Sequence, residues 1–221
     1  MIAGAETTTT LIEWVMTEIM KNLDVMKRVQ EELEEIVGLN NIVEEYHLQK
    51  LQYLDATIKD TLRLHPILPF LMPQSPSKDC MVGGYTVPKD STVLLNVWSI
   101  HRDPQHWDKS AGKSCLNRFN SPDNPLEFNL DRFLTYDEAK KSYNGNNLNF
   151  FPFGSGRLCP GLPLAEKMLL FILASLLHSF DWSLPKGEEH DLSEKFGITL
   201  TKLKPLIAIP SQRLSNVSLY M

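Results

Sequence analysis

The chain has no excess of basic residues, and this limits the classes of partner that it could bind through charge. Its 221 residues include 22 lysines and arginines against 27 aspartates and glutamates, which gives a formal net charge of -5. Proteins that bind nucleic acid or anionic membranes through charge carry the opposite balance. We therefore expect no nucleic acid among the partners of this chain.

Cysteine is also scarce, and its spacing argues against two common uses. Cys80, Cys115 and Cys159 lie far apart and form no Cys-x-x-Cys pair. An odd number at such spacing favours neither a disulfide framework nor a structural zinc site. The pattern is typical of a reducing, intracellular compartment.

Signals for export and membrane insertion are missing as well. The start, MIAGAETTTT, has no basic residue and no apolar core before its threonines. The most apolar stretch, at 168–180, is short for a bilayer span and contains Ser175 and His178. We expect no transmembrane segment in this chain. A hydrophobic content of 43% is instead enough for a globular core.

Helical periodicity dominates the first part of the chain. Apolar residues at helical spacing over 11–37 predict two consecutive helices, the second capped by Asn22 or Asp24. A third amphipathic helix is predicted over 51–62, and Pro66 stops it.

Short strands and a long connector are predicted after the third helix. CMVGGYTVP and STVLLNVW, at 80–88 and 91–98, predict a small sheet, and FGITL and PLIAIP, at 196–200 and 205–210, predict two more strands. Between them, residues 102–150 are rich in Asn, Asp, Pro, Ser and Gly and predict an irregular connector.

The segment 162–180 is apolar on nearly all sides and predicts a buried helix. This order of helices, strands, connector, helix and strands predicts an α+β fold that is mostly α-helical. We expect one domain over residues 1–221.

Cys159 is the main candidate for chemistry. It precedes Pro160, a residue favoured in the first turn of a helix, so its sulfur is expected at the N-terminus of the 162–180 helix. Backbone N–H groups and the helix dipole favour a thiolate there. A buried cysteine in a turn is the alternative interpretation, because free cysteine is often a small hydrophobe.

The residues before Cys159 suit a flat ligand. Gly154 and Gly156 permit a close approach, Arg157 offers a fork for a carboxylate, and Phe153 offers an apolar surface. The arrangement suits a metal held in a planar cofactor.

Four segments then carry motifs in one order: AGAETT at 3–8, KDTLRLHP at 59–66, FNLDRF at 128–133 and FGSGRLCPG at 153–161. They resemble, in turn, the oxygen-activation segment, the Glu-x-x-Arg helix, the segment of its third partner and the cysteine loop of the cytochrome P450 family, the haem-thiolate monooxygenases. The resemblance is to the plant microsomal type, covers nearly the whole chain and implies the C-terminal half of the cytochrome P450 fold.

This resemblance assigns roles to individual residues. It makes Cys159 the axial ligand of haem b (iron protoporphyrin IX), and such a cysteinate favours O–O bond cleavage. The loop around the haem would consist of Phe153, Gly154, Gly156, Arg157 and Gly161. Glu6 and Thr7 would relay protons. A threonine run at a helix start is otherwise most often capping.

Two further sets of residues follow from the resemblance. Asp60 and Arg63 share a helix face, and Arg132 is expected to join them in a buried structural charge network. Such a pair would otherwise be a surface contact worth little. The residues implied for the substrate pocket are Ala3, Gly4, Ile67, Leu68, Phe70 and Ile198.

The implied activity is insertion of one oxygen atom from O2 into a small apolar compound such as a terpenoid. Electrons would come from NADPH through NADPH-cytochrome P450 reductase. Full-length members are expected on the cytosolic face of the endoplasmic reticulum membrane, and this chain, lacking the anchor, in the cytoplasm. Two alternatives stay open: a truncated, non-catalytic remnant that binds haem poorly or not at all, and a helical interaction module.

Departures from the family pattern add expectations. The chain starts inside the oxygen-activation helix, so the N-terminal half of the family is expected to be missing. The cysteine loop is one residue short, which predicts that either Phe153 or the thiolate of Cys159 is displaced. Residues 109–123 resemble an insertion and are expected to form a disordered surface loop.

Three substitutions complete these departures. Asp60 replaces a glutamate, and its shorter side chain is expected to reach two guanidinium groups less well. Gln74 and Leu130 stand where a basic residue and a proline are common in the family.

Overall fold

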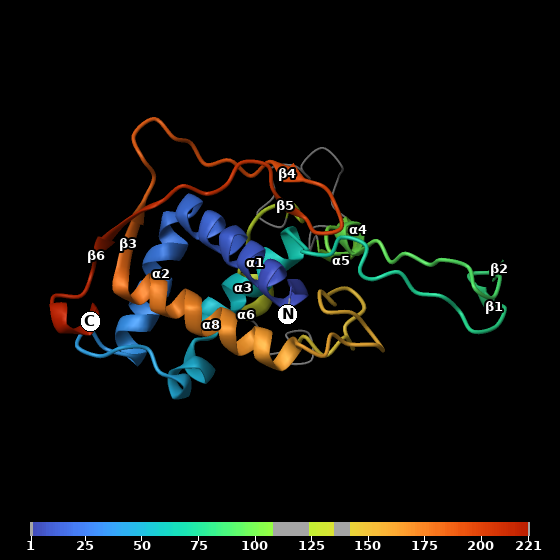
Figure 1. The fold of residues 1–221 in the computed structure, drawn as a ribbon, viewed down its shortest axis with the longest axis horizontal. Coiled ribbons are helices and arrows are strands. Elements are labelled where there is room, and N and C mark those ends of the chain that lie inside the picture. Colours follow the sequence, from blue (N-terminus) through green and yellow to red (C-terminus); the bar gives the residue numbers. More distant parts are fainter. Residues whose placement is uncertain (1, 108–123, 135–141, 221) are drawn as a thin grey trace.

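Four long helices pack together to form the body of the protein (Figure 1). The computed structural model describes residues 2–107, 124–134 and 142–220. The long helices are α1 (Ile2–Lys21), α2 (Leu23–Ile36), α3 (Gln52–Leu64) and α8 (Leu162–Ser179). Helix α1 contacts the other three, and α8 also contacts α2 and α3.

The remaining helices are short. They are η1 (Glu45–Lys50), α4 (Val97–Ile100), α5 (Pro104–Trp107), α6 (Asp131–Leu134) and η3 (Val217–Tyr220). Helix α6 packs on α3, and η1 packs on α8.

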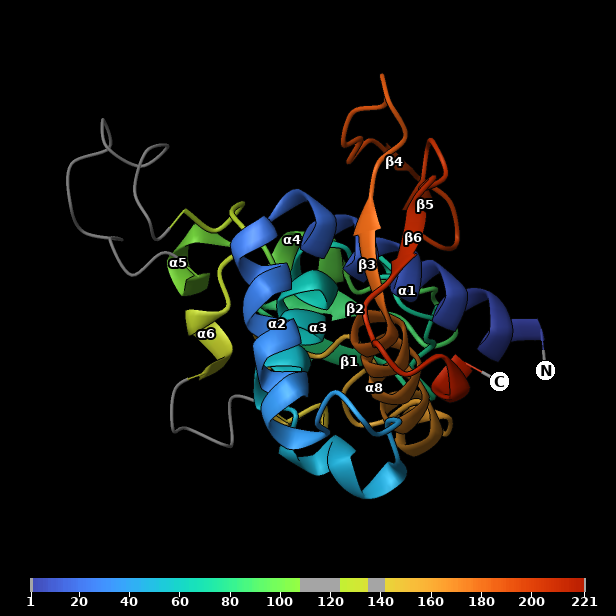
Figure 2. The same cartoon turned by 90° about the vertical axis from the view of Figure 1, so that its left-hand side faces the viewer.

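Within the described residues the strands form three two-stranded antiparallel sheets. They pair β1 (Cys80–Val82) with β2 (Tyr85–Val87), β3 (Phe180–Ser183) with β6 (Ile209–Gln212), and β4 (Glu194–Lys195) with β5 (Thr201–Lys202). The β1–β2 hairpin projects away from the helices (Figure 1), whereas β3 and β6 lie beside them (Figures 1 and 2).

The core lies where the apolar stripes of the long helices meet. Trp14 of α1, Leu33 of α2, Leu54 of α3 and Leu173 of α8 are fully buried. Burial of each such side chain contributes roughly 1.5–3 kcal/mol. The periodicity of the sequence therefore determines which helix faces turn inward.

Local hydrogen bonds set the ends of these helices. Asn22 separates α1 from α2, and its side-chain amide donates to the carbonyl oxygen of Glu18 (2.8 Å). The carboxylate of Glu32, on α2, accepts the backbone N–H groups of Tyr53 (2.7 Å) and Leu54 (3.0 Å). These are N–H groups that the first turn of α3 leaves without an intrahelical partner. Glu32 thus caps α3 from a neighbouring helix.

The fold class is confirmed, as are the two helices within 11–37 and the helix predicted over 51–62. The hairpin within 80–88 is confirmed as well. The strand predicted over 91–98 is wrong. Val93 forms only an isolated bridge with Gln74, and the side chain of Asn96 accepts the N–H of Ser99 (3.0 Å) and so starts α4.

Three expectations in the last third need correction. Residues 196–200 form the turn between β4 and β5 rather than a strand, and 205–210 overlaps β6 only at its end. Helix α8 is not buried on all sides, because no described element covers the side chains of Leu164 and Phe171, which are 65% and 42% exposed. The insertion predicted at 109–123 lies outside the described residues.

By length and composition, α8 is also the one candidate membrane span in the described part of the chain. One such helix is weak evidence. Leu169, Leu173 and Leu177 on its inner face are buried in the core, as they are in many core helices of globular proteins.

Candidate functional site

Cys159 lies in a tight turn at the start of α8. Its N–H donates to the carbonyl oxygen of Phe153 (3.0 Å), and its own carbonyl accepts the N–H of Leu162 (3.2 Å). Gly154 adopts φ 93°, and a Cβ there would lie 2.9 Å from the carbonyl oxygen of Arg157. Glycine is therefore required in this turn.

The thiol of Cys159 is free and exposed. The alternative of a buried cysteine is therefore wrong. Gly161, the residue before α8, leaves the sulfur side of the turn uncrowded, since a Cβ there would meet Sγ at 3.7 Å. Gly156, at φ 74°, and Arg157 are exposed in the same turn.

Phe153 packs against the core. Its ring is partly buried there and meets Tyr143 edge to face, with ring centroids 5.3 Å apart. The displacement expected of a loop that is one residue short stays a prediction.

Two residues that no sequence motif singled out, Tyr143 and Gly145, support the cysteine loop. Tyr143 is buried, and Lys59 Nζ lies 5.1 Å from its ring centroid. Gly145 adopts φ 74°, and a Cβ there would lie 2.5 Å from the carbonyl oxygen of Gly154. Ser155 Oγ donates to the carbonyl oxygen of Gly145 (2.8 Å). The path of residues 143–145 therefore shapes the cysteine loop.

Asp60 and Arg63 form a fully buried ion pair on α3, with Arg63 Nε 2.5 Å from Asp60 Oδ1. The alternative of a surface contact is therefore wrong. Arg63 also donates to the backbone carbonyls of Pro125 (2.5 Å) and Glu127 (2.8 Å), and Asp60 accepts the N–H of Asn129 (2.7 Å). This pair fastens segment 124–129 to α3.

Arg132 lies on α6, just after segment 124–129. It donates to the backbone carbonyls of Trp107 and of Asn124, the latter at 2.8 Å. These bonds join α6 to α5 and to Asn124. Asp60, Arg63 and Arg132 thus act on one stretch of chain.

His101 is a further buried residue in this region. Its Nε2 accepts the N–H of Phe151 (3.1 Å), two residues before Phe153, and its carbonyl accepts from Arg63 (3.4 Å). Burial, with the nearby charges of Arg63 and Arg102, lowers the pKa of His101 to about 3. The imidazole is therefore neutral and links α4 to the chain that leads into the cysteine loop.

The residues expected to face substrate come from three segments that meet. Leu200 N–H donates to the carbonyl oxygen of Ile67 (2.8 Å), and the rings of Phe70 and Phe196 pack edge to face at 5.7 Å. Ile198, at the tip of the 196–200 turn, is 86% exposed. Leu68 is half-buried between Ile67 and Phe70.

The first turns of α1 supply the third segment. Thr199 Oγ1 donates to Glu6 Oε1 (3.4 Å), so Glu6 is in contact with the C-terminal turn. Ala3 and Gly4 lie in the first turn, where Gly4 borders open space, and Thr7 is half-buried one turn further on. Figures 1 and 2 place the N-terminal ends of α1 and α8 on the same side of the helical body.

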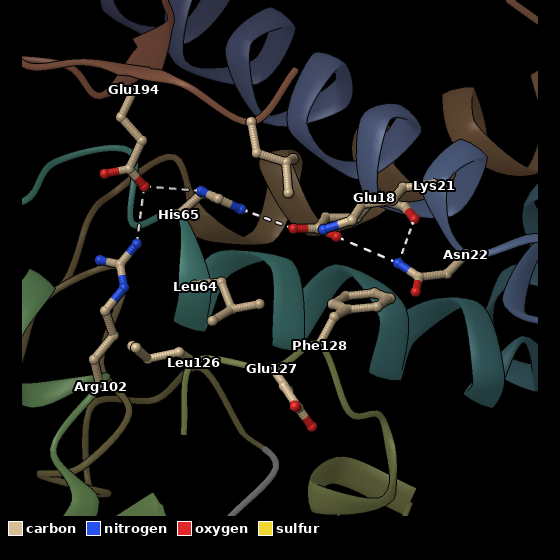
Figure 3. A pocket seen from close by; sticks show the side chains of 11 residues that line it. Glu18, Lys21, Asn22, Leu64, His65, Arg102, Leu126, Glu127, Phe128 and Glu194 are labelled. Carbon is tan, nitrogen blue, oxygen red and sulfur yellow. Dashed lines mark hydrogen bonds and ion pairs between the residues drawn. The ribbon is translucent and has the colours of Figure 1, made fainter. Parts of the chain in front are cut away.

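A cavity of about 670 Å³ opens on another part of the surface, between α1, α3 and β4 (Figure 3). Charged and apolar side chains line it together. His65 lies in its wall between Glu18 and Glu194. His65 lies within the 59–66 motif, but the sequence assigned it no function.

An exposed thiol in a glycine-rich turn at a helix N-terminus, in a chain that also has a buried Asp–Arg pair on another helix, is typical of the class of haem-thiolate proteins. Comparison with family models identifies the family: residues 1–209 match the model described as Cytochrome P450. The chain belongs to the cytochrome P450 family, and the prediction of that family is confirmed. Members of this family are oxidoreductases whose cofactor is a haem held by a cysteine thiolate.

Several relatives and solved structures are similar over most of the chain. Cytochrome P450 76C1 from Arabidopsis thaliana is 43% identical over 98% of this chain and 40% of its own length. Geraniol 8-hydroxylase from Swertia mussotii is 44% identical over 94% of this chain and 39% of its own length. A zebra fish cytochrome P450 with abiraterone superimposes with a TM-score of 0.78 at 31% identity, over 96% of this chain and 45% of the other. The chain thus spans about 40% of the length of the curated relatives it matches.

Proposed function

We propose that this chain provides the thiolate ligand, the proton-relay segment and part of the substrate pocket of a cytochrome P450 monooxygenase. The observation that carries this proposal is the free, exposed thiol of Cys159 in its glycine-rich turn at the N-terminus of α8.

The residues present fit a haem on this side. Cys159 Sγ is accessible, and Gly156 and Gly161 place no side chain beside it. Arg157 is exposed beside the turn, where it could pair with a haem carboxylate. A haem bound through Cys159 would supply the one-electron and oxygen chemistry that protein side chains lack.

The roles of the other residues follow from their positions. Glu6 and Thr7 lie in the first turns of α1, and Glu6 is held by Thr199, so a carboxylate and a hydroxyl are available to pass protons inward. Asp60, Arg63 and Arg132 hold segment 124–129 in place and take no direct part in the chemistry.

The substrate class we propose is a small apolar compound of the terpenoid type. Apolar residues line the place where 67–71, 196–200 and the start of α1 meet, namely Ile67, Leu68, Phe70, Phe196 and Ile198. Relatives named geraniol 8-hydroxylase and iridoid oxidase support this class. The electron donor would be an NADPH-dependent reductase, at the cytosolic face of the endoplasmic reticulum.

A second function has support of its own. The ring of Phe153 packs on Tyr143 and the core while Cys159 is exposed. This observation favours the alternative of a chain that holds haem weakly. The exposed side chains of Leu164 and Phe171 on α8 are compatible with the third alternative, an interaction module.

One experiment separates these functions. The chain is supplied with haem, reduced under carbon monoxide, and its absorption spectrum is recorded. A red-shifted Soret band of the thiolate type supports the proposal, provided that Cys159→Ser abolishes the band and Cys80→Ser keeps it. A folded, soluble chain with no such band contradicts the proposal and leaves the remnant as the explanation.

A further inference from the structure

His65 bridges two carboxylates that come from opposite ends of the chain (Figure 3). Its Nε2 lies 2.9 Å from Glu18 Oε1 on α1, and its Nδ1 lies 3.0 Å from Glu194 Oε1 on β4. His65 and Glu18 are 6% and 2% exposed. One imidazole ring, just after α3, therefore joins the first helix to the C-terminal hairpin.

Glu18 and Glu194 have further hydrogen-bond partners, and together with His65 these residues form one cluster. Glu194 also accepts from Arg102 (2.8 Å) and Trp98 (3.2 Å), and Glu18 also accepts from Asn22 Nδ2 (3.4 Å). An ionised carboxylate only accepts hydrogen bonds, whereas a neutral imidazole has a single N–H. Both ring nitrogens of His65 are therefore engaged, one by each carboxylate.

Charged groups surround the ring. Glu18 and Glu194 pair with His65, Glu194 also pairs with Arg102, and the charge of Lys202 acts on Glu18. Burial alone raises the pKa of Glu194, but hydrogen bonding to His65 and the charge of Arg102 hold that pKa below its ordinary value. Removing His65 would leave both carboxylates short of a partner in a mostly buried cluster, which is costly.

Ring stacking between Trp14 and His65 gives independent support for the position of His65. Trp14 of α1 lies parallel to His65, with ring centroids 3.9 Å apart and planes at 4°. The face of an indole attracts a cation. Lys202 of β5 approaches the Trp14 ring too, at 5.1 Å, and Lys21 and Glu127 line the adjoining cavity.

The same residues hold the turn between β4 and β5. Trp14 Nε1 donates to the carbonyl oxygen of Leu200 (3.0 Å), and the N–H of Leu200 donates to Ile67 (2.8 Å), two residues after His65. Glu194 begins β4, at the other end of the hairpin. His65 and Trp14 together therefore fasten both ends of the 196–200 turn.

We propose that His65, hydrogen-bonded between Glu18 and Glu194, is a positioning residue that holds the 196–200 turn against α1 and α3. Without the ring, Glu18 and Glu194 lose their shared partner, so the hairpin loosens. The link from this turn to a substrate rests on the proposed function. The fastening itself rests only on contacts within the chain.

Amide hydrogen exchange of the full chain, followed by nuclear magnetic resonance, tests this directly. In His65→Gln the amide of Leu200 should exchange about tenfold faster than in the unaltered chain, while that of Leu54, in the core of α3, should change by less than about twofold. Glu194→Gln removes one facing charge and should speed Leu200 exchange by a smaller factor.

Two variants separate positioning from general stability. His65→Gln should make Leu200 exchange faster. His178→Gln, at another buried histidine whose Nε2 bonds to the carbonyl of Asn41 (3.0 Å), should leave Leu200 exchange unchanged. Equal Leu200 exchange in His65→Gln and the unaltered chain overturns the proposal. Neither measurement uses haem, so a missing carbon monoxide band contradicts the proposed function alone.

Discussion

The indole N–H of Trp14 donates to the carbonyl oxygen of Leu200, 186 residues further along the chain, at 3.0 Å. This bond brings the first helix and the C-terminal turn together. Thr199 reaches Glu6 on the same helix, and Phe196 packs on Phe70. Segments that resemblance alone assigned to a substrate pocket are therefore neighbours in space.

Neutralising Asp60 should strongly destabilise the fold. Asp60→Asn leaves the fully buried Arg63 without its counter-charge, and we expect the free energy of unfolding to fall by about 3–5 kcal/mol. Urea denaturation measures the change. Lys27→Ala is the control, because Lys27 pairs with Glu31 on the exposed face of α2 and should cost less than about 1 kcal/mol. Similar losses in both variants would contradict the structural role of Asp60.

A methyl group at Gly145 should disturb the cysteine loop. In Gly145→Ala the new Cβ lies 2.5 Å from the carbonyl oxygen of Gly154, in a backbone conformation that L side chains disfavour. We expect a loss of about 2–4 kcal/mol and faster amide exchange at Cys159.

Gly187→Ala is the matched control for Gly145→Ala. Gly187 also adopts a positive φ, of 89°, but has open space around it, so only the backbone cost of about 1–2 kcal/mol should remain. Unchanged exchange at Cys159 in Gly145→Ala would show that residues 143–145 do not shape the loop.

Removing the carboxylate of Glu32 should weaken the start of α3. A glutamine retains one acceptor oxygen for the N–H groups of Tyr53 and Leu54, so one buried donor loses its partner. We expect Glu32→Gln to cost about 1–2 kcal/mol in urea denaturation. Glu35→Gln, at an exposed position of the same helix, should change stability by less than about 0.5 kcal/mol.

The neutral His101 should make the fold sensitive to acid. Its pKa is about 3 in the folded protein and 6.5 in the unfolded chain, so between these values only the unfolded chain takes up the proton. Its contribution to stability is complete above pH 6.5 and is lost as the pH falls toward 3, by up to about 1.4 kcal/mol per pH unit.

Urea denaturation at a series of pH values between about 6.5 and about 5 measures this slope before most carboxylates titrate. His101→Gln retains an acceptor for the N–H of Phe151 and should flatten the slope by up to one proton. His106→Gln, at an exposed position, should leave it unchanged. An equal slope in His101→Gln and the unaltered chain would exclude His101 as the source.

Local patterns predicted the helices and failed for the small strands. Helix α3 combines an apolar stripe with a stop at Pro66, and both signals are local. The 91–98 segment looks like a strand, but the side chain of Asn96 starts a helix there, and Val93 has only Gln74 as a ladder partner. Strand pairing depends on a partner far along the chain, which periodicity does not reveal.

Some residues of the candidate site could likewise be predicted from local sequence, and others could not. The motif around Cys159 points to its own chemistry, because its glycines and proline are adjacent in sequence. His65 gave no such signal, since its two carboxylates lie 47 and 129 residues away. Gly145 could have been noticed only as an isolated glycine within the connector, and its role depends on contact with Gly154.

The guanidinium of Arg63 holds the connector by its backbone, at the carbonyls of His101, Pro125 and Glu127. Hydrogen bonds to backbone carbonyls depend on the path of the chain and not on which side chains it carries. Evolution is therefore free to vary exposed positions such as Leu126 and Glu127 while the arginine keeps its place. A randomised library at these two positions should return many folded sequences, whereas one at Arg63 should return almost none.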